Sequence, residues 1–181
     1  MARCLEIHSA TPDSDPGVGT PSHLLGEQFR VTLGLDMVHV PYGGSGPAIV
    51  SAVAGQTPVV FAALSAAAPQ AREGKLRLLA VMSKSRAEGV KEAPTIAEAG
   101  YPDMDGDGWV GLFMPAGTPK EIIARLNAEI AKVMNTAVVK ERMATQGFER
   151  LSMSPGEFAA FLQTDLTKWG KVIKTAGIRA E

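Results

Sequence analysis

The strongest constraint on the fold is an alternation of short apolar segments with short helix-forming segments between residues 37 and 82. Three runs are apolar on both faces: residues 37–41, 58–62 and 76–82. Two segments with helix start signals lie between them and end at Gly55 and Gly74. Strands that are buried on both faces and separated by helices are typical of a parallel sheet covered on both sides. The sequence therefore predicts an α/β, doubly wound sheet over residues 15–106.

A glycine-rich loop precedes the first of these strands. Gly17 and Gly19 permit backbone conformations that other residues resist, Thr20 is a good helix N-cap, and Pro21 suits the first helical position. Several N–H groups would then point at one spot, at the positive end of a helix dipole. This predicts an anion site for a carboxylate or a phosphate. The alternative is a plain loop with a capped helix.

Sharper readings of the loop do not fit. A nucleotide-binding P-loop needs Lys after the glycines, and a dinucleotide fingerprint needs a third glycine where Ser22 stands. In parallel sheets, ligands bind beyond the carboxyl ends of the strands. The turns at residues 41–47 and 63–65 occupy such ends, so we expect them beside the loop. The predicted binding residues are Gly17, Gly19, Thr20, Ser22, His23, Tyr42, Gly44, Ser45 and Ser65.

The C-terminal part of the chain is predicted to be mainly helical. A fourth strand is expected at residues 109–114. Capping-box spacings at Thr118 and Ser154 predict helix starts. Apolar residues then recur at helical spacing on one face of each predicted helix, which requires a surface to pack on: Ile122, Leu126, Ile130, Phe158, Leu162 and Trp169.

Motifs for catalysis and metal binding are incomplete. A nucleophile elbow around Ser45 fails because Pro47 stands where the second glycine is needed. The acidic turn at residues 103–108 resembles half of a calcium loop, but Met114 replaces the required Glu. The three histidines lack the spacing of a metal pair, and His39 is expected to be a core residue. No metal or cofactor is predicted. A small hydrolase or transferase using His23 and Ser45 remains the alternative function.

Bulk properties exclude several classes of protein. The net charge of −1 gives no electrostatic case for nucleic-acid binding, and the single cysteine, Cys4, excludes an internal disulfide. No apolar run reaches the roughly 20 residues of a membrane span. The N-terminus shows no apolar core of a signal peptide. Residues 1–14 are predicted to be an irregular tail.

Six segments, taken in order, resemble one protein family. They are Gly17–Leu24 (GVGTPSHL), His39–Ala48 (HVPYGGSGPA), Gly74–Val81 (GKLRLLAV), Ala93–Gly100 (APTIAEAG), Pro115–Pro119 (PAGTP) and the stretch Lys168–Ile178. Each motif alone is weak, but the ordered set is specific and covers residue 15 to the end. On these segments the chain resembles the Bug-type extracytoplasmic solute receptors of tripartite tricarboxylate transporters.

The resemblance implies a type II periplasmic-binding-protein fold and a receptor that is not an enzyme. Two α/β domains would close over a small carboxylate, and the receptor would deliver it to membrane transporter subunits in the periplasm. By this resemblance, residues 15–106 form the complete ligand-binding domain, and residues 107–181 form the C-terminal part of the other domain. The implied ligand is a dicarboxylate, a tricarboxylate or an aromatic acid.

Two departures from the family pattern shape the expectations. The first part of the other domain precedes the match in family members, so we expect a receptor truncated at its N-terminus. The turn after the predicted strand at residues 58–62, from Ala62 to Ser65, lacks the family's Asp or Asn, which favours a plain acid over an amino acid. The apolar helices would then lack a partner surface, which predicts weak binding and self-association. A non-functional remnant of a receptor is the third hypothesis.

Overall fold

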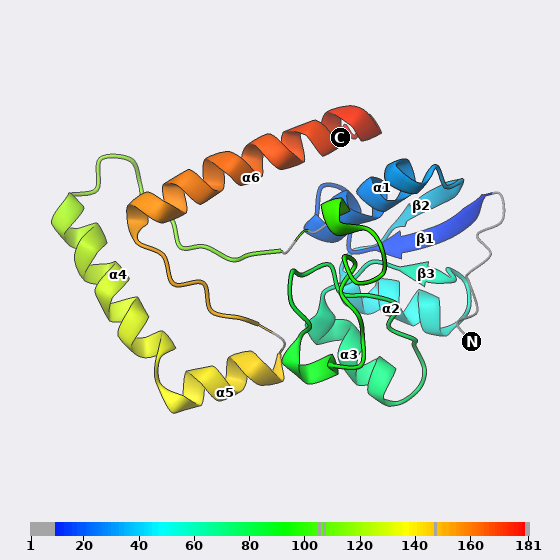
Figure 1. Cartoon of the computed structure of the whole chain (residues 1–181), viewed down its shortest axis with the longest axis horizontal. Helices are drawn as coiled ribbons and strands as arrows, with labels where there is room; N and C mark the ends of the chain where they lie inside the picture. Colours follow the sequence, from blue (N-terminus) through cyan, green and yellow to red (C-terminus); the bar gives the residue numbers. More distant parts are fainter. Residues whose placement is uncertain (1–9, 105, 107, 147, 180–181) are drawn as a thin grey trace.

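The computed structural model describes residues 10–104, 106, 108–146 and 148–179. In this part of the chain, three parallel strands are covered by helices on both faces, and three further helices form an arm that extends to one side (Figure 1). The elements are β1 (Thr11–Asp15), α1 (Pro21–Leu33), β2 (Met37–Pro41), α2 (Ser45–Val53), β3 (Val59–Val60), α3 (Leu64–Arg72), η1 (Glu88–Val90), η2 (Pro102–Met104), α4 (Lys120–Met134), α5 (Ala137–Thr145) and α6 (Pro155–Ala176).

The central strand of the sheet is β1, in the order β2-β1-β3. Both pairings are parallel, and Asp13 lies opposite His39 on one side and Val59 on the other. The prediction of an irregular tail is therefore wrong for residues 11–14, while residues 1–9 lie outside the described residues. The strand escaped the sequence pattern because its buried side chains, Asp13, Ser14 and Asp15, are all polar.

A chain of hydroxyl groups satisfies the buried side chain of Ser14. The Thr57 hydroxyl donates to Ser14 Oγ at 2.9 Å, and Ser51 lies 3.0 Å from Thr57. Tyr42 completes the chain by donating its hydroxyl to Ser51 at 2.7 Å. Buried polar groups cost free energy unless they are hydrogen-bonded, so this network allows a polar strand to run through the middle of the sheet.

The helices α1 and α2 lie on opposite faces of the sheet (Figure 1). This arrangement and the strand order agree with the predicted doubly wound fold. Thr20 and Gly34 set the ends of α1: the Thr20 hydroxyl accepts the His23 N–H, and Gly34 adopts a left-handed conformation with φ of 61°. The connections reverse direction between β1 and β3, so the loops after these strands flank a switch point, where ligands bind in such sheets.

Two predicted strands are absent from the described residues. Residues 76–82 form no strand and make a single parallel bridge, between Val81 and Thr95. Their apolar character reflects burial, because Val81 packs with Ala68, Val90 and Ala93 in a small core. A short apolar run does not distinguish a strand from a buried connection.

Residues 109–114 also form no strand, because no described strand lies beside them. They run as an extended connection toward the arm, and Val110 is 90% exposed. Trp109 is anchored at one end, with its indole N–H donating to Asp165 at 2.8 Å and its ring edge-on to Phe158 and Phe161. The segment thus follows α6 without joining the sheet.

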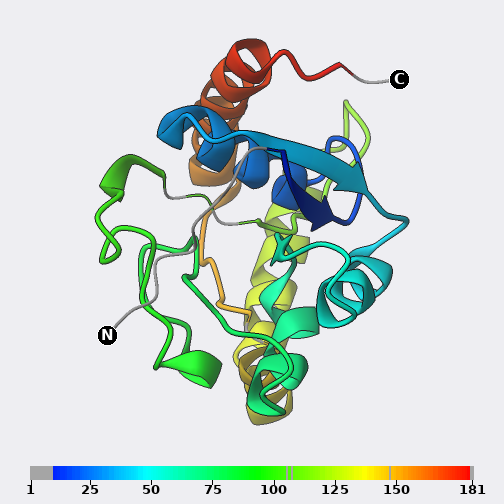
Figure 2. The same cartoon turned by 90° about the vertical axis from the view of Figure 1, so that its right-hand side faces the viewer.

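The arm consists of α4, α5 and α6, and none of its described residues is buried. The predicted capping box at Ser154 is present, with reciprocal bonds to Glu157. The predicted box at Thr118 is wrong, because Pro119 is the N-cap and the Thr118 hydroxyl donates to Pro115. The end of α6 lies along α1, which joins the arm to the sheet (Figures 1 and 2).

Removing the Ser14 hydroxyl should destabilise the sheet. In Ser14→Ala the Thr57 hydroxyl loses its buried acceptor, so we expect the free energy of unfolding to fall by about 1–3 kcal/mol. Urea denaturation followed by circular dichroism measures the change. Ser85→Ala, at an exposed position, should alter stability by less than about 0.5 kcal/mol. Equal stability of Ser14→Ala and the wild type would contradict the role of the network.

Candidate functional site

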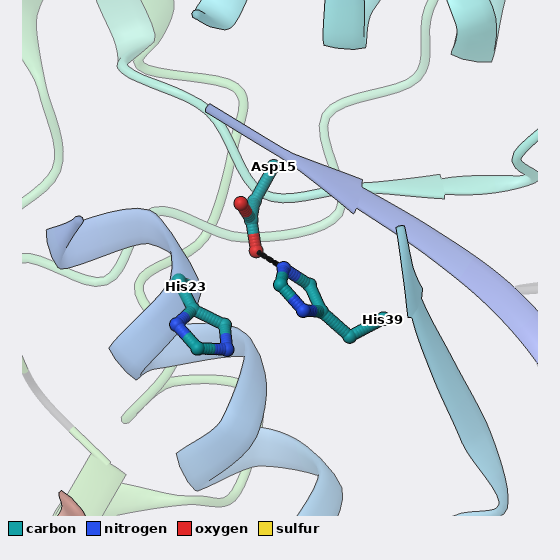
Figure 3. A group of neighbouring side chains, drawn as sticks. All are labelled: Asp15, His23 and His39. Atoms are coloured by element: carbon teal, nitrogen blue, oxygen red, sulfur yellow. Dashed lines mark ion pairs between the residues drawn. The ribbon is translucent and has the colours of Figure 1, made fainter. Parts of the chain in front are cut away.

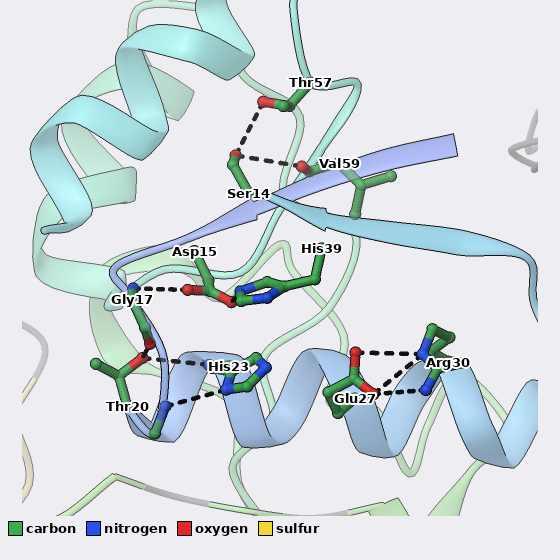
Figure 4. Close-up of polar contacts among 11 residues, drawn as sticks. Ser14, Asp15, Gly17, Thr20, His23, Glu27, Arg30, His39, Thr57 and Val59 are labelled. Carbon is green, nitrogen blue, oxygen red and sulfur yellow. Dashed lines mark hydrogen bonds and ion pairs between the residues drawn. The ribbon is translucent and has the colours of Figure 1, made fainter. Parts of the chain in front are cut away.

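The glycine loop joins β1 to α1 and is held by its own side chains (Figure 4). The Gly17 N–H donates to Asp15 Oδ1 at 2.6 Å, and the Gly19 N–H donates to His23 Nδ1 at 3.1 Å. Thr20 donates its hydroxyl to the Gly17 carbonyl at 2.7 Å. Two of the N–H groups expected to face an anion are therefore already bonded. Those of Val18 and Ser22 have no partner among the described residues.

Beneath the loop, Asp15 and two histidines form a compact cluster (Figure 3). Asp15 Oδ2 lies 2.5 Å from His39 Nε2, and this contact is an ion pair when His39 is protonated. The two atoms are not aligned as a hydrogen bond, so Asp15 Oδ2 is a buried oxygen without a hydrogen-bond donor. The rings of His23 and His39 stack with centroids 4.0 Å apart.

Further charged groups surround this cluster on the same face of β1. Burial raises the pKa of Asp13 to about 6. The charge of His39 lowers this pKa, whereas the charges of Asp15 and Glu27 raise it further. Burial also lowers the pKa of His23, and the positive charge of His39 acts in the same direction. Glu27 forms an ion pair with Arg30, in which Arg30 Nη2 lies 2.7 Å from Glu27 Oε2.

The cluster brings three possible metal ligands within 4.8 Å of one another: Asp15, His23 and His39. A metal ion lies in the plane of each imidazole that binds it, about 2 Å from the nitrogen. The two rings here are stacked with only 21° between their planes, so their in-plane lone pairs do not converge on one point. The arrangement therefore does not suit a cation bound by both rings.

The other predicted binding residues lie around the same edge of the sheet. Gly17 lies against the second turn, where a Cβ atom added to it would be 3.1 Å from the Tyr42 carbonyl oxygen. The Tyr42 hydroxyl points into the Ser51 network, so it is already engaged. Gly44 has φ of 142° and Ser45 begins α2 without capping it. Ser65 is exposed in the first turn of α3.

A hollow of about 220 Å³ opens beside the loop. Gly19, Pro21 and Leu24 form one wall, and residues of α6 and of the segment that runs beside it form the other: Gly108, Trp109, Asp165 and Trp169. Ser65 lines a separate small cavity against α5. The structure thus places the loop, but not Ser65, next to a space large enough for a small solute.

Asp15 and His39 are the parts of this cluster that the sequence reasoning missed as a site. Asp15 stands at the first position of the predicted domain and is given no role there, and His39 is expected to be a core residue with a satisfied side chain. His39 is indeed largely buried, but its ring faces Asp15 and His23. The signal that could have found the pair is positional, since Asp15 and His39 both stand at or near the ends of strands that feed the predicted ligand edge.

Comparison with known proteins identifies the family. Residues 12–178 match the tripartite tricarboxylate transporter family receptor, TctC. The chain belongs to this family. Proteins of the TctC family are solute receptors and not enzymes, so the hydrolase alternative is wrong. In agreement, His23 bonds Gly19 and Thr20, and its ring stacks on His39.

Individual relatives support the assignment. BugT of Bordetella pertussis is 32% identical over 162 residues, which are 90% of this chain and 50% of that protein. A solved structure of a periplasmic transporter has a TM-score of 0.84 and 33% identity, over 94% of this chain and 57% of that one. The chain spans about half the length of the curated relatives it matches.

Two similar solved structures hold a named acid. R. palustris Rpa4515 with adipate matches with a TM-score of 0.83 and 30% identity, over 94% of this chain and 57% of its own. MatC (Rpa3494) from Rhodopseudomonas palustris with bound malate matches with a TM-score of 0.73 and 29% identity, over 93% of this chain and 59% of its own.

Within the described part of the chain, no helix is long and apolar enough to cross a membrane.

Asp13 should make folding of this TctC-family chain pH-dependent. Its pKa is about 6 when folded and 3.8 ordinarily, so the folded state holds the proton more tightly and stability falls as pH rises from about 4 to 6. Asp13→Asn removes this loss. At about 1.4 kcal/mol for each pH unit between the two values, the variant should gain up to about 3 kcal/mol at pH 7.5 and little at pH 4.

Urea denaturation at the two pH values tests this prediction. Asp103→Asn, at an exposed position, serves as the control and should leave the difference between pH 4 and pH 7.5 unchanged. An Asp13→Asn variant whose stability difference from the wild type is the same at both pH values would show that Asp13 does not titrate in this range.

Proposed function

We propose that this chain is the loop-bearing part of a periplasmic receptor that binds a small dicarboxylate and presents it to a tripartite transporter. The observation that carries the proposal is the glycine loop at the start of α1, beside a hollow lined by Gly19 and two tryptophans. Helix N-termini and adjacent turn N–H groups favour anions. The family membership supports the receptor role, and the periplasmic neighbours support the location.

The ligand class is inferred from the chemistry of the site. The available donors are the N–H groups of Val18 and Ser22 and the Ser22 hydroxyl, which suit one carboxylate. Beyond them the hollow is lined by Leu24, Trp109 and Trp169, which suit an aliphatic or aromatic body. Neighbours that hold adipate and malate are consistent with an acid of this size. A tricarboxylate or an aromatic acid would use the same donors.

Affinity of this chain for such an acid should be weak. Small-molecule sites normally enclose 70–90% of their ligand's surface. This hollow is lined by the glycine loop, the start of α1, α6 and the segment beside α6, so it covers a smaller share of a bound acid. We therefore expect dissociation constants of about 1 mM, equivalent to about 4 kcal/mol. A remnant without binding activity is the competing hypothesis, and ligand titration separates the two.

Calorimetric titration with adipate should give a saturable signal that depends on Gly19. This residue has φ of 77°, so Gly19→Ala strains the loop and should weaken binding by about tenfold. Gly34→Ala is a matched control, because Gly34 also has a positive φ and open space, but at the far end of α1. Both variants should lose similar stability, and only Gly19→Ala should lose affinity. No signal with adipate, malate or benzoate would favour the remnant.

We also propose that two copies associate through the exposed apolar side chains of the connection that leads to the arm. Val110 and Leu112 are 90% and 71% exposed, and large exposed patches favour association. Light scattering should show a mass above that of a monomer at micromolar concentration. Val110→Lys with Leu112→Lys should restore the monomer, whereas Val50→Lys, at an exposed position on α2, should not. A monomeric wild type would exclude this proposal.

A further inference from the structure

The Gly19 N–H and His23 Nδ1 form a hydrogen bond that depends on the protonation state of His23. Nδ1 accepts the N–H at 3.1 Å, so it carries a lone pair and the proton of the neutral ring is on Nε2. Once Nδ1 is protonated, it becomes a donor and the two N–H groups face each other without an acceptor. An incoming carboxylate oxygen would supply that acceptor.

The geometry points to His23 as the residue that takes up a proton from solvent when a carboxylate binds at the glycine loop. This inference rests on the proposed function and names its regulation. With His23 neutral, the loop offers two free N–H groups, those of Val18 and Ser22. With His23 protonated, Gly19 N–H and His23 Nδ1–H join them, and the added positive charge attracts the anion.

Asp15 explains why the proton is needed. Its carboxylate is 1% exposed, binds the Gly17 N–H, and has one oxygen without a hydrogen-bond donor. A solute carboxylate at the loop would bring a second negative charge close to this one, and like charges in a buried site disfavour each other. Protonation of His23 offsets the added charge. In the absence of solute, burial lowers the His23 pKa, so the ring is neutral at pH 7.5 and can accept the proton.

The charged groups around His23 come from several elements. His39 on β2 opposes its protonation, while Asp15 on β1 and Glu27 on α1 favour it. Glu27 is paired with Arg30, which reduces its effect. The elements α6 and η2 also pack on α1, and they carry Asp165, bonded to the Trp109 indole, Lys168, positioned over the Trp169 ring, and Asp103.

Proton uptake has two measurable consequences. If protonated His23 binds adipate more tightly than neutral His23, saturating adipate must raise the His23 pKa. The rise equals the logarithm of the ratio of the two affinities for adipate. Affinity must also rise as pH falls, by up to about tenfold per pH unit where one proton is taken up. NMR titration of the histidine ring C–H signals, with adipate and with NaCl at equal ionic strength, measures the first. Calorimetry from pH 6 to 8 measures the second.

Three variants assign the proton. His23→Gln identifies the His23 signal and should bind adipate with the same affinity at pH 6 and pH 8. Asp13 has a pKa of about 6 but is not among the charged groups that shift the pKa of His23, so Asp13→Asn should keep the pH dependence. Asp15→Asn retains an oxygen for the Gly17 N–H and removes the charge, so it should bind more tightly than the wild type at pH 8.

The outcomes separate the two proposals. A His23 pKa that adipate raises by about one pH unit, together with loss of the pH dependence in His23→Gln only, supports the inference. Binding of adipate without a change in the His23 pKa overturns it and leaves the receptor function intact. Loss of the pH dependence in Asp13→Asn instead assigns the proton to Asp13 and also overturns it. Absence of adipate binding between pH 6 and pH 8 overturns both.

Discussion

The structure depends on the burial of a polar strand. β1 lies between β2 and β3, and both pairings and the first helix depend on it. Asp13, Ser14 and Asp15 are 5%, 0% and 1% exposed, and none contributes the apolar surface that normally stabilises a central strand. The Thr57 hydroxyl bonds Ser14, and the Gly17 N–H bonds one oxygen of Asp15 while His39 lies beside the other, whereas burial raises the pKa of Asp13. The strand's stability is thus tied to the loop that follows it.

Sequence reasoning was reliable for most features that local chemistry decides, although the predicted capping box at Thr118 is wrong. Thr20 marks the start of α1 and Ser154 marks the start of α6, because a capping side chain acts within one turn. Sequence reasoning was unreliable where pairing with residues far along the chain decides whether a segment forms a strand. The apolar runs at residues 76–82 and 109–114 predict strands, but a strand needs a partner strand. Among the described residues, 76–82 has a single bridge and 109–114 has none. β1 has two neighbours and no apolar signal.

The candidate site shows the same division. The loop, its helix and the second turn were predictable, because glycines, a capping Thr and strand ends each have a local meaning. Whether the N–H groups of the loop are free or hydrogen-bonded was not predictable. Gly17 and Gly19 were expected to present free N–H groups, yet Asp15 and His23 accept both. Asp15 reaches its donor because it ends β1, and His23 does so because it stands in the first turn of α1.

These internal bonds change how an anion would meet the loop. A carboxylate that displaced Asp15 from the Gly17 N–H would leave a second oxygen of a buried aspartate without a donor, and an unsatisfied charged group costs more than about 1–3 kcal/mol. A carboxylate that displaces only His23 from Gly19 meets no such cost, because protonation turns His23 from an acceptor into a second donor. The easier route therefore keeps the Asp15 bond and exchanges the His23 bond. Asp15 therefore keeps its bond to the Gly17 N–H when an anion binds, whereas His23 releases the Gly19 N–H.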